Sequence, residues 1–217
     1  MSYLSSVSLE FSPRKGIFIL LVLHIVGLVG IVLSPYSALF IACTPLHLLI
    51  CGGILFWFEE DRSWKFFAFL LLLGLLGFGA ETVGVHGQWL FGSYSYGQIF
   101  GPRIAGVPPL IGLLWATLIY ALLSILSFLP LGYLQRALVV ALALVGLDAL
   151  LEPTAIKLGF WAWDGGVVNP QNYRGWVLCG FLFSLMGQKI FCPSYNPIAV
   201  PLLAMQTIFF VCISLFG

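Results

Sequence analysis

Three carboxylic acids, Glu81, Asp148 and Glu152, lie within apolar runs of a chain in which only 8% of the residues are charged. An ionised acid at the centre of a membrane-spanning helix costs about 3 kcal/mol on insertion scales. Because Asp148 and Glu152 are four residues apart, they lie on one face of a helix. Two close carboxyl groups in a low-dielectric medium do not both ionise readily. We therefore expect one of the pair to keep its proton at neutral pH and to act as an acid.

Each acid also has a structural interpretation that the sequence leaves open. A structural alternative for the pair on one helix face is a hydrogen bond to a neighbouring helix, or an ion pair with Lys157 or Arg174. Glu81 is followed five residues later by His86, around an expected helix end. That histidine is either a catalytic partner of the acid or the anchor of a loop.

The sequence gives no indication of a metal site or of a disulfide framework. His24 and His47 each lie alone in an apolar run, which is typical of an interior histidine, and no HxxxH or ExxH spacing supports a metal site. The cysteines are scattered without a CxxC pair, so we interpret them as small buried side chains. They are Cys43, Cys51, Cys179, Cys192 and Cys212. We accordingly expect neither a metal nor another cofactor.

Aromatic residues gather around two glycine-rich segments that follow the acids. An aromatic belt at the membrane interface would explain part of this enrichment. Alternatively, electron-rich ring faces stabilise a carbocation, and glycines let a rod-shaped apolar ligand approach the backbone. On this second interpretation, the candidate substrate-binding residues are Trp89, Phe91, Tyr94, Tyr96, Trp115, Trp161, Trp163, Asn172, Tyr173, Arg174 and Trp176.

A neutral carboxylic acid beside aromatic faces is suited to protonating an isolated alkene, which is a weak base. If water captures the resulting cation, the product is a tertiary alcohol. If a second double bond captures it, the product is a ring. The residues therefore predict acid chemistry on a lipid-soluble, electron-rich molecule.

Long apolar runs must position these side chains. The chain of 217 residues is 61% hydrophobic with a mean hydropathy of +1.08, which excludes an ordinary soluble domain. Its formal net charge of +1 offers no basic surface to nucleic acid. We predict an all-α integral membrane protein with a single domain over residues 1–217. The seven expected transmembrane helices span residues 14–34, 37–58, 64–83, 108–128, 133–152, 175–191 and 197–216, with a kink or an end at Pro153.

Charges in the loops predict the orientation of this bundle. The side that holds the N-terminus carries six cations against three on the other side, which favours a cytoplasmic N-terminus in a bacterial cytoplasmic membrane. The six are Arg14, Lys15, Arg62, Lys65, Arg136 and Lys189. The two long segments rich in Gly and Trp, residues 84–108 and 153–174, then share the opposite face. We expect the three acids to converge beneath them.

Two blocks of sequence surround the acids. The first contains Glu81-Thr82-Val83-Gly84-Val85-His86 and Phe91-Gly92-Ser93-Tyr94-Ser95-Tyr96. The second contains Leu147-Asp148, Glu152-Pro153, Gly159-Phe160-Trp161-Ala162-Trp163 and Asn172-Tyr173-Arg174-Gly175-Trp176. In this order the blocks resemble the carotenoid 1,2-hydratase family of bacteria and archaea, the family of γ-carotene 1'-hydroxylase and bisanhydrobacterioruberin hydratase.

The resemblance implies addition of water to the C1–C2 double bond of an acyclic ψ-end group, in a carotenoid such as lycopene or γ-carotene, without a metal or redox cofactor. Asp148, Glu152 and Glu81 would supply the proton donor and a base that orients water. We expect Asp148 or Glu152 to be the donor and the remaining carboxylate to orient the water, with help from His86. Membrane lipid would surround the bundle, and the glycines of the 64–83 helix permit a homo-oligomer. A carotenoid cyclase that uses the same protonation is an alternative, as is a carotenoid-binding membrane protein without catalysis.

Overall fold

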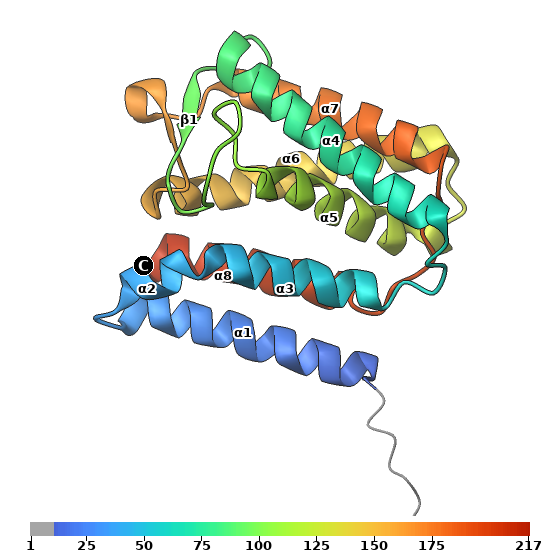
Figure 1. Cartoon of the computed structure of the whole chain (residues 1–217), viewed down its shortest axis with the longest axis horizontal. Helices are drawn as coiled ribbons and strands as arrows, with labels where there is room; N and C mark the ends of the chain where they lie inside the picture. The colour runs from blue at the N-terminus through green and yellow to red at the C-terminus, as the bar shows by residue number, and fades with distance from the viewer. Residues whose placement is uncertain (1–10) are drawn as a thin grey trace, which may run out of the picture.

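The computed structural model describes residues 11–217, and most of them are helical (Figure 1). The helices are α1 (Pro13–Leu33), α2 (Ser37–Ala42), α3 (Thr44–Trp57), α4 (Trp64–Gly87), α5 (Leu110–Ile125), α6 (Tyr133–Lys157), α7 (Pro170–Gln188) and α8 (Ala199–Phe216). The short 3-10 helix η1 (Leu126–Phe128) extends α5, and η2 (Asp164–Gly166) precedes α7. Two three-residue strands, β1 (Tyr94–Tyr96) and β2 (Trp161–Trp163), follow α4 and α6.

Within residues 11–217, five stretches of helix are long and apolar enough to cross a membrane: α1, α4, α5 with η1, α6 and α8. The predicted all-α class is confirmed, whereas the predicted count of seven spans is not. The single helix predicted over residues 37–58 is wrong, because the chain divides there into α2 and α3. Pro45 in the first turn of α3 has no N–H with which to continue the preceding helix.

Two further helix boundaries differ from the prediction and bear on the acids. Helix α6 does not end at Pro153 but continues to Lys157, so Glu152 lies inside the helix. Helix α7 begins at Pro170, five residues earlier than expected. Asn169 caps this helix by accepting a 2.9 Å hydrogen bond from the backbone N–H of Gln171, and proline is favoured at the first helical position. The earlier start places Asn172 on the first turn of α7.

The helices form two layers (Figure 1). One layer contains α1, α2, α3 and α8, and the other contains α4 packed on α5 and α6 packed on α7. Small residues permit the closest of these contacts. A Cβ at Gly77 of α4 would overlap the indole of Trp115 on α5, and Gly74 of α4 lies against Gly112. The α4–α5 contact therefore holds Trp115 directly beside α4.

The two segments rich in Gly and Trp meet at one end of the molecule, as the sequence predicts. Strands β1 and β2 pair in antiparallel fashion, with Tyr94 opposite Trp163 and Tyr96 opposite Trp161. The pairing continues at Gly97, whose N–H donates to the carbonyl of Phe160 at 2.8 Å. Because alternate side chains of a strand share a face, the two tyrosines and the two tryptophans project from one face of this ribbon.

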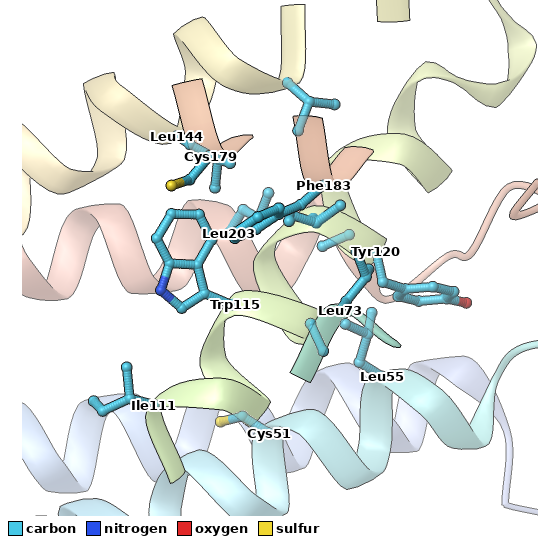
Figure 2. Close-up of a cluster of buried hydrophobic side chains, with 14 of the residues drawn as sticks. Cys51, Leu55, Leu73, Ile111, Trp115, Tyr120, Leu144, Cys179, Phe183 and Leu203 are labelled. Carbon is cyan, nitrogen blue, oxygen red and sulfur yellow. The ribbon is translucent and has the colours of Figure 1, made fainter. Parts of the chain in front are cut away.

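A buried apolar cluster joins the two layers around Trp115 (Figure 2). Trp115 is 1% exposed and lies beside Cys179 and Phe183 of α7, while Cys51 and Leu55 approach from α3. The indole ring stacks on Trp176 at a centroid distance of 4.3 Å. The core therefore fixes the one polar atom of Trp115, Nε1, in position for a hydrogen bond.

Candidate functional site

Glu81 on α4 lies in the interior and accepts hydrogen bonds on both carboxyl oxygens. Its side chain is 4% exposed. The hydroxyl of Tyr94 donates to Oε2 at 2.5 Å and that of Tyr96 donates to the same oxygen at 2.8 Å. The indole N–H of Trp115 donates to Oε1 at 3.0 Å. Three donors from β1 and α5 therefore converge on one acid.

Asp148 and Glu152 lie one turn apart on α6 and are 1% and 2% exposed. The side-chain amide of Asn172 joins them, with Nδ2 at 2.6 Å from Asp148 Oδ2 and 3.5 Å from Glu152 Oε1. Glu152 Oε2 also accepts from the indole N–H groups of Trp161 at 2.9 Å and Trp163 at 3.0 Å. An indole nitrogen only donates, so this oxygen is an acceptor in both bonds.

One oxygen of this acid pair differs from the others. Oδ1 of Asp148 is buried and has no hydrogen-bond partner among residues 11–217. A buried oxygen without a partner costs about 1–3 kcal/mol relative to a bonded one. A catalytic role is one explanation for a buried polar atom that has no hydrogen-bond partner. Asp148 therefore has one oxygen fixed by Asn172 and one that is free to hold or receive a proton.

The ribbon of β1 and β2 links the two acid clusters. Tyr94 and Tyr96 of one strand donate to Glu81, and Trp161 and Trp163 of the other donate to Glu152. Burial, followed by the nearby Glu81 carboxyl, raises the pKa of both tyrosines well above its ordinary value. The two phenols consequently stay protonated and act as donors. Four side-chain donors of one ribbon thus join the Glu81 cluster to the Glu152 cluster.

A pocket of about 350 Å³ lies between the two layers of helices, and its walls are mostly apolar. Among the three acids, Glu81 is on the pocket wall, together with Tyr96, Trp115 and Trp161. Further lining residues are Phe100, Leu151, Phe160 and Trp176. An apolar pocket with a few convergent polar groups is the usual form of a small-molecule site. The arrangement is suited to holding the end of an apolar molecule against a carboxyl group.

The structure brings together most of the residues that the sequence analysis selected, although not all of them. Phe91 is 1% exposed and packs with its ring centroid 6.3 Å from that of Tyr94. Trp89 is 64% exposed, Arg174 is also exposed, and Tyr173 is half-buried. Within the described residues, none of these three side chains makes a hydrogen bond to the acids. They lie outside the hydrogen-bonded centre of the site.

His86 also differs from its expected place. It is exposed, and Nδ1 lies 2.9 Å from the carbonyl oxygen of Thr82, one turn earlier on α4. Since a carbonyl only accepts, Nδ1 is the donor in this bond. Glu81 uses its oxygens for the phenols and the indole instead. Among the described residues, His86 is therefore bonded to its own helix and not to Glu81, which is the contact that both sequence-based interpretations expected.

Sequence reasoning missed several features of the site. It treated the tryptophans as ring faces, whereas three of them also donate N–H groups to the acids. It treated His24 and His47 as isolated, but their ring centroids lie 4.6 Å apart and both histidines line the pocket. The i to i+4 spacing of His47 and Cys51 on one helix was a signal for this second cluster. Nothing in the sequence indicated that α1 would bring His24 beside it.

Comparisons with known proteins bear on this site. The sequence model of a family described as "Carotenoid biosynthesis protein" matches residues 36–217. Bisanhydrobacterioruberin hydratase of Haloarcula japonica is 32% identical over an alignment of 126 residues, and the match covers 54% of this chain and 43% of that protein. The match thus spans less than half the length of the relative. No solved structure matches the chain.

Proposed function

Because the chain belongs to the carotenoid biosynthesis protein family, we propose that it is a carotenoid hydratase acting on an acyclic ψ-end group. It adds water across the C1–C2 double bond and gives a tertiary 1-hydroxy carotenoid. The observation that carries this proposal is the position of Glu81. It is a buried carboxyl on the wall of an apolar pocket, between aromatic rings and hydrogen-bond donors. The hydratase among the relatives supports the same reaction class.

Glu81 is the proposed proton donor. A general acid must reach the atom that it protonates, so geometry is decided before acidity. Glu81 lines the pocket, whereas Asp148 and Glu152 are not among the residues of its wall. When Glu81 gives its proton to C2, the new carboxylate is stabilised by the phenols of Tyr94 and Tyr96 and by the indole of Trp115. The donors therefore favour the state that follows proton transfer.

The cation that forms at C1 is tertiary and needs protection until water arrives. Trp115, Trp161 and Trp176 line the pocket, and the faces of aromatic rings stabilise cations. The proton added to C2 and the hydroxyl added to C1 together make one water. The attacking water passes its proton to the pair Asp148 and Glu152. One proton then returns from that pair to Glu81, which restores the starting state, and no electron is transferred. The reaction as written requires no redox cofactor.

Asp148 and Glu152 are proposed to orient the attacking water and to accept its proton. Asn172 and the two indoles hold three of the four oxygens of this pair. Oδ1 of Asp148 is the remaining one. An oxygen with an unused lone pair is suited to accept a hydrogen bond from water. The helix pair then serves as the base of the reaction, while Glu81 serves as the acid.

The setting of this reaction is proposed to be the bacterial cytoplasmic membrane. Five apolar stretches of helix support insertion in a bilayer. The count of basic residues supports a cytoplasmic N-terminus, and seven spans result if α3 and α7 also cross. A lipid-soluble polyene with its ψ-end in the pocket would extend from the protein into the surrounding lipid.

The test is expression of the chain in a host that makes lycopene, and in a second host that makes γ-carotene. We expect a product heavier than the substrate by one water, detected by liquid chromatography with mass spectrometry. Glu60→Gln is a matched control, because Glu60 is an exposed acid in the turn before α4. Its product yield should equal that of the wild type. A ring product with the same mass as the substrate would show that the protein is a cyclase and not a hydratase. Copurification of unchanged polyene, in both hosts, would indicate a binding protein and overturn the proposal.

A further inference from the structure

A cluster of two histidines and a cysteine lies apart from the acids, and its two histidines line the pocket. His24 of α1 approaches His47 and Cys51 of α3. One ligand atom from each side chain, two ring nitrogens and the sulfur, lies within 4.8 Å of the others. His47 Nε2 is 3.5 Å from Cys51 Sγ. Two helices that are separate in sequence therefore bring three ligands to one place.

The hydrogen bonding of His24 leaves one ring nitrogen available as a ligand. Nδ1 of His24 lies 2.8 Å from the carbonyl oxygen of Leu20, which only accepts, so Nδ1 carries the proton. Nε2 is consequently a lone-pair donor. It is buried and has no hydrogen-bond partner among the described residues, in a side chain that is only 5% exposed. Metal-binding histidines commonly use one nitrogen for the metal and the other for a backbone carbonyl.

The distances suit a three-coordinate centre. Bonds of about 2.0–2.3 Å from a metal to nitrogen and sulfur place the ligands of a trigonal site about 3.5–4 Å apart. The separation of His47 and Cys51 already has this value. His24 needs to approach by at most about one ångström, given its upper bound of 4.8 Å. Phe209 of α8 covers the cluster, with its ring centroid 6.0 Å from His24 and 6.3 Å from His47.

We propose that His24, His47 and Cys51 form a binding site for a thiophilic transition-metal ion, best matched by Cu(I). Thiolate and imidazole are ligands that Cu(I) and Zn(II) share. Charge distinguishes the two ions. A thiolate with two neutral imidazoles makes a neutral complex with Cu(I) and a cationic complex with Zn(II), and an uncompensated charge is costly among apolar helices. The bound ion would connect α1 to α3.

The experiment uses the full chain, purified in detergent and reduced. Cu(I) is supplied without oxygen in competition with bathocuproine disulfonate, and bound copper is counted by inductively coupled plasma mass spectrometry. We expect about one copper per chain in the wild type. Cys51→Ala and His24→Gln should each lower the affinity for Cu(I) by more than roughly a hundredfold. Loss of a residue that only hydrogen-bonds to a metal ligand costs about 10–100-fold, and loss of a ligand itself should cost more. Cys212→Ala removes a cysteine of α8 outside the cluster and should leave the affinity unchanged.

A second measurement does not depend on the variants folding. X-ray absorption at the copper edge of the wild type should show one sulfur and two imidazole nitrogens as ligands. A spectrum with nitrogen and oxygen alone would overturn the site, as would equal copper affinity in Cys51→Ala and the wild type. Parallel samples receive zinc, and retention of zinc without copper would overturn the copper assignment. Hydratase activity is not a readout in either measurement, so failure here leaves the proposed reaction untouched.

Discussion

Two buried glutamates, Glu59 and Glu81, have nearly the same local chemistry and different surroundings. Glu59 is 1% exposed and accepts from the hydroxyls of Tyr120 at 2.7 Å and Ser194 at 3.2 Å, and from the backbone N–H of Asp61 at 3.1 Å. Glu81 likewise accepts from phenols and from one N–H group. Only Glu81 of the two lines the pocket. Burial and hydrogen bonding are therefore common to the two carboxyl groups, and contact with the pocket is what separates Glu81 from Glu59.

The partners of Glu59 explain its structural role. Asn196 donates to the hydroxyl of Tyr120 at 2.9 Å and to the carbonyl of Leu55 at 2.8 Å. These bonds connect the end of α3 to α5 and to the segment before α8, far from β1 and β2 in the fold (Figure 1). Glu59 thus joins loops, while Glu81 presents a carboxyl to a cavity.

The sharpest test of this difference is one substitution made at both sites. Glu81→Gln should lower product formation by about 10³-fold, because an amide cannot donate the proton. Glu59→Gln should keep activity per folded molecule within about twofold and lower the free energy of unfolding by about 1–3 kcal/mol. Product is measured by chromatography and normalised to monodisperse protein. Equal activity losses in the two variants would remove the distinction.

Asp148→Asn should have the next largest effect, a loss of about 10²-fold in product formation. The substitution keeps the size of the side chain but replaces the carboxylate with an amide. The oxygen that lacks a partner, Oδ1, then no longer belongs to a group that can accept a proton from water. Glu60→Gln is again the control for loss of one acid. Product formation by Asp148→Asn at the wild-type rate would assign the water-orienting role to another group.

A matched pair of phenols should give a smaller contrast. Tyr96→Phe removes one donor to Glu81, and Tyr120→Phe removes one donor to Glu59. We expect about a tenfold loss of activity in Tyr96→Phe, since a hydrogen bond to a charged group contributes about 1.5–3 kcal/mol. Tyr120→Phe should instead lower the thermal midpoint and leave the rate per folded molecule within about twofold. The two readouts are turnover and scanning fluorimetry, and an exchange of the two outcomes would contradict the comparison.

His86→Ala should have the smallest effect. Activity should stay within about twofold of the wild type, and the free energy of unfolding within about 0.5 kcal/mol, as is usual for exposed positions. His86 bonds to the carbonyl of its own helix and not to Glu81. Product yield from the same host measures this outcome. A loss as large as that of Asp148→Asn would restore His86 to the catalytic group.

The acids and their aromatic neighbours could be predicted from the sequence, because a charged group in an apolar run and a cluster of Trp and Tyr are visible along the chain. Their pairing across space could not. Asn172 bridges Asp148 and Glu152 only because α7 starts at Pro170. Trp115 reaches Glu81 only because Gly77 lets α5 approach α4. Both depend on helix boundaries and packing, which periodicity determines least well.

The buried role of Glu59 was hidden for a related reason. It lies beside Glu60, Asp61 and Arg62, and such a run is typical of a solvated turn. Its partners Tyr120 and Ser194 are 61 and 135 residues away. The sequence contains no local signal for contacts at that separation. The same limit concealed His24 beside His47.

Because β1 pairs with β2, an insertion or deletion beside a strand should disturb the site more than a substitution within it. A substitution at Tyr94, Tyr96, Trp161 or Trp163 removes one donor and leaves three. An insertion or deletion of one residue beside either strand would turn both donors of that strand to the opposite face, because the side chains alternate. One acid would then lose both ribbon donors in a single step. Changes in substrate preference should therefore accumulate by replacement within these strands, while length variation is confined to the turns beyond them.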